Sequence, residues 1–183
     1  MIITLSGLPG AGKGTVGRML AKKLNYQYIA GGDMFRKIAR DKYKMTMDEF
    51  DKFLTKNPEI KVDEEIDNLQ KNLGKTKNNF ILDSRLGWFF IPHSFKILLK
   101  ADLDERVRRI TNDKSGHRIA FRQGTFSEIK KRTQEREKNH QKRIERLYGI
   151  KNMVDDNHFD LVVDTNQISP QEVVDIILNN IRK

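Results

Sequence analysis

The residues with the clearest chemical pattern are GLPGAGKGT, residues 7–15, which follow the apolar run Ile2–Ser6. Gly7, Gly12 and Lys13 fit the spacing G-x-x-x-x-G-K, and a hydroxyl follows at Thr15. Glycines let successive backbone N–H groups turn toward an anion, and the N-terminus of a following helix adds positive charge. A lysine can reach terminal phosphates, and a hydroxyl can contact phosphate or magnesium. The pattern predicts a nucleoside triphosphate site made of Gly7, Leu8, Pro9, Gly10, Ala11, Gly12, Lys13, Gly14 and Thr15.

Two arginines follow later apolar runs and could bind a second phosphate. Arg36 lies in GGDMFR with Asp33, and Arg85 follows Asp83 at the end of the third run. Ligands bind at the carboxyl ends of parallel strands, and a guanidinium can bind phosphate oxygens in pairs. Asp83 is placed to hold magnesium, directly or through water. The plainer alternatives are a helix cap for Asp33, a solvated surface position for Arg36 and an Asp–Arg pair that closes a turn.

The positive charge is concentrated in one segment. The chain has a formal net charge of +10, and residues 114–146 contain eleven Lys or Arg against four Glu. Arg132, Arg136 and Arg143 fall within about 40° of one another on a predicted helix. One arginine could simply pair with Glu128. The alignment favours a compact anion over an extended phosphate backbone, and it predicts stabilisation of charge on a transferring group.

A basic loop bounded by glycines precedes this helix. Residues 116–124, GHRIAFRQG, carry Arg118 and Arg122. This composition predicts a mobile lid over about residues 114–125 that brings an arginine over the reacting phosphates and excludes water.

Short apolar runs alternate with amphipathic stretches, which is typical of βα units around a parallel sheet. We expect strands at residues 2–6, 27–30, 79–83, 94–99 and 159–164. We expect helices at residues 13–24, 33–41, 47–56, 62–73, 104–112, 126–148 and 170–181. Thr46 and Thr125, each followed three residues later by Glu, fit the capping box at a helix start. The chain is expected to form one α/β domain over residues 1–183.

The composition excludes several kinds of site. There is no cysteine, so disulfides, thiolate zinc sites and cysteine nucleophiles are excluded. The four histidines are scattered, and each is expected to be exposed or locally hydrogen-bonded. Trp88 and the pair Phe89-Phe90 are expected to be core residues. No apolar run approaches ~18 residues, and no basic region with a following apolar stretch opens the chain, so we expect a cytoplasmic protein.

The chain resembles archaeal-type cytidylate kinases along nearly its full length. The resemblance rests on the glycine loop and on GDMFR, which is similar to the GD-x-x-R element of adenylate and cytidylate kinases. It also rests on RLGW at residues 85–88, on the arginine-rich predicted helix followed by YGI at residues 148–150, and on residues 159–165. Leu86 stands where bacterial cytidylate kinases place a carboxylate, and the loop spelling GAGKGT is closer to adenylate kinases.

The resemblance implies a P-loop fold with three αβα layers, a five-stranded parallel sheet, a helical monophosphate-binding arm at about residues 32–74 and a short lid. It implies phosphate transfer from ATP, with Mg²⁺, to CMP or dCMP by a monomer that uses neither membrane nor nucleic acid. The implied catalytic residues are Lys13, Arg132 and Arg136. The implied acceptor ligands are Asp33, Arg36, Arg85, Arg136 and Arg143. Arg118 and Arg122 would contact ATP, and Thr15 and Asp83 the metal.

Three alternatives stay open from the sequence. An adenylate kinase would share the loop and the first acceptor arginine. A P-loop ATPase acting on RNA or ribosome particles would use the basic helix against a phosphate backbone. A kinase for a non-nucleotide metabolite, such as shikimate or a coenzyme A precursor, is the third.

Overall fold

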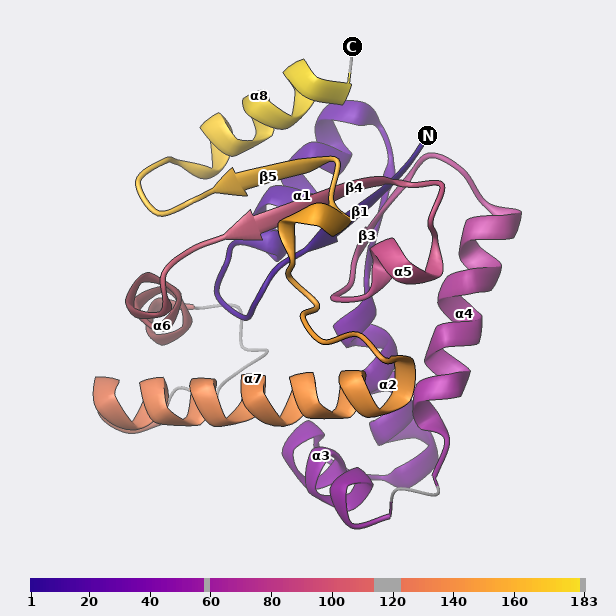
Figure 1. Ribbon diagram of the computed structural model, residues 1–183, viewed down its shortest axis with the longest axis vertical. Coiled ribbons are helices and arrows are strands. Elements are labelled where there is room, and N and C mark those ends of the chain that lie inside the picture. The colour runs from indigo at the N-terminus through magenta and orange to yellow at the C-terminus, as the bar shows by residue number, and fades with distance from the viewer. Residues whose placement is uncertain (58–59, 114–122, 182–183) are drawn as a thin grey trace.

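The computed structural model describes residues 1–57, 60–113 and 123–181, and its centre is a five-stranded parallel sheet (Figure 1). The strands are β1 (Ile2–Ser6), β2 (Gln27–Ala30), β3 (Phe80–Asp83), β4 (Phe95–Lys100) and β5 (Leu161–Asp164), in the order β2-β3-β1-β4-β5. This is an α/β fold, as the alternating pattern predicts.

The middle strand β1 places the glycine loop at the carboxyl edge of the sheet. All five residues of β1 are buried, because strands with neighbours and helices on every side require apolar or hydrogen-bonded side chains. Asp83 is in register with Leu5 of β1 and with Ala30 of β2. The ends of β1, β2 and β3 therefore meet at one place, from which the loop, α2 and the Arg85 turn all continue.

Helices cover both faces of the sheet. On one face, α1 (Lys13–Leu24) and α8 (Pro170–Ile181) pack their apolar side chains onto β1, β4 and β5. On the other, α5 (Gly87–Phe90) and residues from the end of α7 (Phe126–Tyr148) form a second cluster around Phe80 and Leu82. The short 3₁₀ helix η2 (Asp156–His158) precedes β5.

Three helices between β2 and β3 form a helical arm with its own small core. They are α2 (Gly31–Tyr43), α3 (Met47–Lys56) and α4 (Val62–Thr76). Ile38, Phe50, Leu54 and Ile66 meet inside the arm. Because this core is separate from the clusters against the sheet, the arm is a distinct packing unit beside α7 (Figure 1).

Two helices follow β4 and complete the fold. α6 (Leu103–Asn112) packs on the N-terminal part of α7 through Val107, Ile110 and Ile129. α7, which we call the arginine helix, runs across the mouth of the sheet from α6 to the arm (Figure 1). Its capping box at Thr125 and Glu128 is formed as predicted, and so is the one at Thr46 and Glu49. No helix in the described ranges has the length and apolar character needed to cross a membrane.

The differences from the predicted elements have local causes. α2 begins two residues earlier than expected, at Gly31, because β2 passes into the helix without a side-chain cap at Ala30. A side chain at Gly31 would stand 3.2 Å from the carbonyl oxygen of Asp83, so this junction needs a glycine. α5 and η2 are too short to show a helical period. The prediction that Phe89 is a core residue is wrong, since it is 40% exposed, whereas Trp88 and Phe90 are buried.

Candidate active site

The glycine loop is fixed by three backbone positions that only glycine adopts easily. Gly7, Gly10 and Gly12 have φ angles of 143°, 86° and 94°. A side chain on Gly7 would collide with the carbonyl oxygen of Leu99, and one on Gly10 would stand 2.5 Å from that of Arg106. A side chain on Gly12 would meet the end of Arg109 at an ordinary 3.8 Å. The loop is thus pressed against β4 at Gly7 and against α6 at Gly10, and it is less confined at Gly12.

Lys13 lies across this loop at the start of α1. Its Nζ donates to the carbonyl oxygens of Gly7 at 2.8 Å and Leu8 at 3.2 Å. The first amides of α1 have no acceptor inside the helix, so the ammonium and the helix N-terminus place positive charge at the same point. Thr15 is exposed one turn further along. This is the arrangement that a nucleoside triphosphate requires.

Asp83 is held by a tyrosine that the sequence pattern did not indicate. The Tyr28 hydroxyl donates to Oδ2 of Asp83 at 2.8 Å, and Arg18 lies over the Tyr28 ring at 5.5 Å. Burial, followed by the negative charge of Asp83, raises the pKa of the Tyr28 hydroxyl. The tyrosine therefore stays protonated and orients the carboxylate.

The donor set near the loop fits a hard cation that keeps most of its ligands from phosphate and water. Within the described ranges, no group of three or more His, Cys, Asp and Glu side chains could hold a metal by itself. Among the described residues, Thr15 near the start of α1 offers a hydroxyl and Asp83 at the end of β3 offers an oriented carboxylate. Mg²⁺ is bound in this way, with one or two protein oxygens and substrate phosphates.

The first acceptor arginine pairs with its own helix. Arg36 donates through Nε and Nη2 to Oδ1 of Asp33, and both side chains are partly exposed, at 38% and 63%. Asp33 makes no capping bond, because α2 already begins at Gly31. The pair holds one edge of the guanidinium at the start of α2.

Three other predicted arginines act electrostatically on His140 of the arginine helix. Burial lowers the pKa of His140 far below its ordinary 6.5, and the positive charges of Arg85, Arg143 and Arg136 lower it further. Arg85 comes from the turn after β3, so two distant segments supply one cationic group. We call Arg85, Arg136 and Arg143 around His140 the arginine cluster. The prediction that each histidine is exposed or locally bonded is wrong for His140, which lies inside this cluster and is partly buried.

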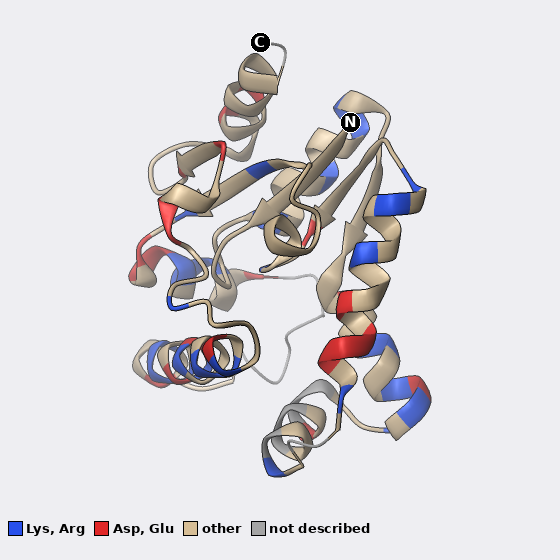
Figure 2. Ribbon diagram, turned by 45° about the vertical axis from the view of Figure 1, so that its right-hand side comes forward, with Lys and Arg blue, Asp and Glu red and all other residues tan. Residues whose placement is uncertain are grey.

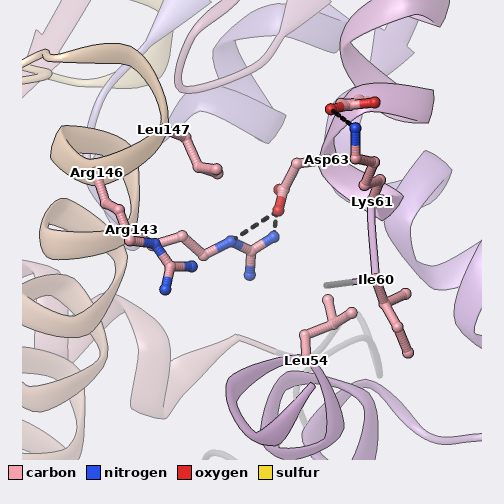
Figure 3. A pocket seen from close by; sticks show the side chains of 8 residues that line it. Leu54, Ile60, Lys61, Asp63, Arg143, Arg146 and Leu147 are labelled. Carbon is pink, nitrogen blue, oxygen red and sulfur yellow. Dashed lines mark hydrogen bonds and ion pairs between the residues drawn. The ribbon is translucent and has the colours of Figure 1, made fainter. Parts of the chain in front are cut away.

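Arg143 also connects the arginine helix to the arm. It forms a two-nitrogen ion pair with Asp63 of α4 (Figure 3). Its guanidinium carbon also lies 5.7 Å from the centre of the Phe35 ring. The adjoining pocket measures about 60 Å³ and is lined by residues of α3, α4 and α7, among them Leu54, Asp63 and Arg143. A water needs roughly 10–15 Å³ of such space, so a nucleotide does not fit while α4 and α7 stay this close.

One turn along the same two helices, a second bond joins them. The Tyr148 hydroxyl donates to Oδ2 of Asp67 at 2.5 Å. Burial raises the pKa of Asp67, and burial with this bond raises that of Tyr148. Acidic residues gather on the N-terminal part of α4, and both signs alternate along α7 (Figure 2). The Arg143–Asp63 and Tyr148–Asp67 bonds therefore join this acidic part of the arm to the arginine helix.

Arg132 lies in the N-terminal half of the arginine helix, on the same face as Arg136 and Arg143. Its guanidinium donates to the carbonyl oxygen of Gln123, and its Nε lies 3.4 Å from that of Glu128. Arg118 and Arg122, predicted to contact ATP, lie outside the described residues.

Two further arginines of α6 are linked to the glycine loop, Arg106 directly and Arg109 through Thr165. Arg106 donates to the Pro9 carbonyl at 3.2 Å and to Glu137 of the arginine helix. Arg109 donates to Thr165 Oγ1 at 2.9 Å, and that hydroxyl lies 3.4 Å from the Ala11 carbonyl oxygen. Sequence reasoning missed them because their partners are 31 and 56 positions away along the chain, so no local spacing marks them.

Known proteins of one family are similar to this chain over nearly its full length. Residues 2–167 match the model of the cytidylate kinase-like family. A cytidylate kinase from Halobacterium salinarum is 34% identical over 181 residues, which cover 98% of this chain and 88% of that protein. One from Sulfolobus acidocaldarius is 35% identical over 185 residues, covering 100% and 95%.

One similar protein is longer and carries another name. An S-adenosylmethionine-dependent nucleotide dehydratase from Lacinutrix mariniflava is 34% identical over 181 residues, 99% of this chain but only 36% of that protein. Among solved structures, an uncharacterized protein from Eubacterium ventriosum has a TM-score of 0.71 at 12% identity, covering 100% of this chain and 99% of that one. Shikimate kinase from Bacteroides thetaiotaomicron has a TM-score of 0.66 at 16% identity, covering 100% of this chain and 99% of that one. At these identities, the structures bear on the fold alone.

Proposed function

Because the chain belongs to the cytidylate kinase-like family, we propose that it transfers the γ-phosphate of ATP to CMP or dCMP, giving ADP and CDP or dCDP. The observation that carries the proposal is the glycine loop with Lys13 lying across it at the start of α1, while Arg85, Arg136 and Arg143 are all near enough to His140 to lower its pKa. Guanidinium groups from the turn after β3 and from α7 can bind the oxygens of a dianionic acceptor phosphate.

The donor nucleotide is assigned to the glycine loop. The amides of residues 7–15 and the ammonium of Lys13 bind the β- and γ-phosphates, at the point where the helix N-terminus adds its charge. Thr15 and Asp83 would hold Mg²⁺, directly or through water, and Tyr28 orients Asp83. When bound, the metal neutralises charge on the phosphates. Arg118 and Arg122 remain predicted ATP ligands.

The acceptor is assigned to the space between the helical arm and the sheet edge. Arg36, oriented by Asp33, and Arg85 bind the monophosphate from the arm and strand sides. Arg143 binds it after exchanging Asp63 for phosphate oxygens, because both offer two oxygens to the same guanidinium fork. Arg132 and Arg136 stabilise the charge that spreads over the transferring group.

The reaction then needs alignment and little covalent help. An oxygen of the acceptor phosphate forms a bond to the γ-phosphorus while the bond from that phosphorus to the β–γ bridging oxygen breaks, and ADP leaves with the electron pair. The attacking phosphate is already an anion, so no general base is required. Exclusion of water from the site prevents transfer to water.

A coupled assay of ADP formation tests the proposal with AMP, CMP, dCMP, UMP and GMP as acceptors, and again with bulk RNA. We expect CMP or dCMP to give the highest kcat/KM, and removal of Mg²⁺ by EDTA to abolish turnover. Arg143→Gln should lower kcat/KM for the acceptor about 10- to 100-fold, the value of one charge-assisted phosphate contact. Lys142→Gln, an exposed neighbour on the same helix, is the matched control. Hydrolysis stimulated by RNA without phosphorylation of any monophosphate would refute the proposal.

A further inference from the structure

Arg106 is a buried charge with partners on three sides. Its side chain is only 6% exposed, and that of its partner Glu137 is 16% exposed. A guanidinium in such a place is stable only when its N–H groups find acceptors. Nε donates to the Ala101 carbonyl at 3.0 Å, and Nη1 to the Pro9 carbonyl at 3.2 Å. Nη1 and Nη2 donate to the two carboxylate oxygens of Glu137.

These bonds join the glycine loop to the arginine helix through one side chain. Pro9 belongs to the loop, Arg106 to α6 and Glu137 to α7. The loop also rests on the backbone of the same residue, since a side chain at Gly10 would stand 2.5 Å from the Arg106 carbonyl oxygen. A displacement of the loop therefore reaches Glu137 through a single rigid, planar group.

Glu137 is well placed to set the rotation of the arginine helix. It follows Arg136 directly, and it points toward α6, whereas Arg143 and His140 contribute to the arginine cluster on the adjoining side. A helix held at Glu137 cannot turn about its axis without moving Arg136. The position of the arginine cluster relative to the loop is thus tied to one ion pair.

Two other contacts join α6 and α7 without involving a residue of the loop. Ile129 packs on Val107 and Ile110, and Lys130 pairs with Asp104 at 2.5 Å on the surface. They hold the helices together but touch no residue of the phosphate site. This difference separates a structural contact from a positioning one.

We propose that Arg106 and Glu137 are positioning residues that couple the glycine loop to the arginine helix, so that donor phosphate in the loop aligns Arg132 and Arg136 for transfer. This inference rests on the proposed phosphoryl transfer. Neither residue touches substrate. Their effect is on kcat and on the use of ATP in the absence of acceptor, rather than on acceptor binding.

The decisive variant replaces both partners at once with apolar residues of similar length, R106M/E137M. Loss of one partner strands a buried charge and destabilises the fold, whereas loss of both is often neutral or stabilising. The double variant therefore keeps the fold while removing the link to Pro9. Glu137→Gln, which breaks the ion pair to the arginine helix while Arg106 keeps the carbonyl acceptors of Pro9 and Ala101, is the second variant should the first fold poorly. Lys130→Gln removes an ion pair between the same helices and is the control.

Each protein is compared for unfolding temperature, kcat and KM for the five monophosphates, ATP hydrolysis without acceptor, and hydrogen exchange of α7 amides with and without a non-hydrolysable ATP analogue. In both pair variants we expect kcat to fall about 10- to 100-fold, as for an ångström-scale misalignment, with acceptor KM changing less than threefold. ATP analogue should protect α7 in the wild type and in Lys130→Gln but not in the pair variants.

Wild-type kcat and retained protection in R106M/E137M or in Glu137→Gln would overturn the inference and leave the pair a structural one. Should the wild type phosphorylate none of the monophosphates, the proposed function fails on that result. The exchange comparison then decides on the coupling by itself, because it needs ATP binding and no acceptor.

Discussion

A methyl group added at Gly17 should displace Tyr28 and thereby disturb Asp83, the carboxylate proposed to hold the metal. Gly17 is buried in α1, and a Cβ there would stand 2.6 Å from Cε2 and 3.1 Å from Cδ2 of Tyr28. Carbon atoms in contact are ordinarily ~3.5–4.0 Å apart, so the ring must move by about 1 Å. The Tyr28 hydroxyl is at 2.8 Å from Asp83, and such a movement breaks that bond.

The expected cost of Gly17→Ala follows from three terms. Overpacking against the ring costs about 1–3 kcal/mol, and a lost hydrogen bond to a carboxylate costs about 1.5–3 kcal/mol when water does not replace it. Alanine stabilises a helix interior by about 1 kcal/mol relative to glycine, which offsets part of this loss. Because Asp83 is only partly buried, water replaces part of the bond. We expect a net loss of about 1–3 kcal/mol, or roughly 2–10 °C in Tm for a chain of this size.

Thermal unfolding and the Mg²⁺ concentration for half-maximal turnover test this expectation. Gly14→Ala is the stability control, since its nearest neighbour is the flexible end of Arg18 at 3.4 Å. Tyr28→Phe removes the hydroxyl alone and should raise the Mg²⁺ requirement with a smaller loss of stability. Equal unfolding temperatures for Gly17→Ala and Gly14→Ala, with unchanged Mg²⁺ dependence, would refute the role assigned to Tyr28.

Three further predictions follow from the site. Gly10→Ala should destabilise the fold by about 2–4 kcal/mol, because left-handed backbone strain adds to a clash with Arg106, whereas Gly12→Ala should cost only about 1–2 kcal/mol; chemical denaturation of the two variants measures the difference. The folded state holds the pKa of His140 below its ordinary 6.5, so below that pH the unfolded chain binds a proton that the folded chain does not. The free energy of unfolding should therefore decrease as the pH falls below 6.5, by up to about 1.4 kcal/mol per pH unit. His140→Gln should flatten that slope in unfolding experiments at pH 5–7. Asp63→Asn should release Arg143 and tighten binding of inorganic phosphate or CMP a few-fold by calorimetry, while weaker binding would mean that Asp63 orients Arg143 for its ligand.

Most of the fold could be predicted because the local signals were consistent. β1, β2, α1, α3, α7 and α8 have the bounds that the apolar periods and caps indicate. The remaining ends differ by one to three residues, where no cap or glycine marks the boundary, as at Thr76 of α4. The packing of α7 across the sheet mouth was not predicted, because its attachments depend on single pairs such as Arg143–Asp63, 80 positions apart.

The site residues that could be predicted are likewise those whose signal lies in local sequence. The glycine loop was predictable residue by residue, because its chemistry lies in consecutive backbone positions. The arginine cluster was predictable in part, since Arg136 and Arg143 lie seven positions apart on one helix and repeat on one face. The meeting of Arg85 with them, and the roles of Tyr28 and Arg106, depend on strand register and helix packing. Neither strand register nor helix packing can be derived from the local spacing of residues.

The arginine cluster also implies a relation between ligand binding and stability. The positive charges of Arg85, Arg136 and Arg143 all act on His140, and their guanidinium groups are charged donors that an anion can accept from. An anion that binds only the folded state stabilises it by RT ln(1 + [L]/Kd), about 2.7 kcal/mol at a hundredfold excess over Kd. A monophosphate that fits should therefore raise Tm by several degrees more than the same concentration of sulfate. An equal response to both anions would mean that the cluster recognises charge alone, and that discrimination between acceptors arises at the helical arm.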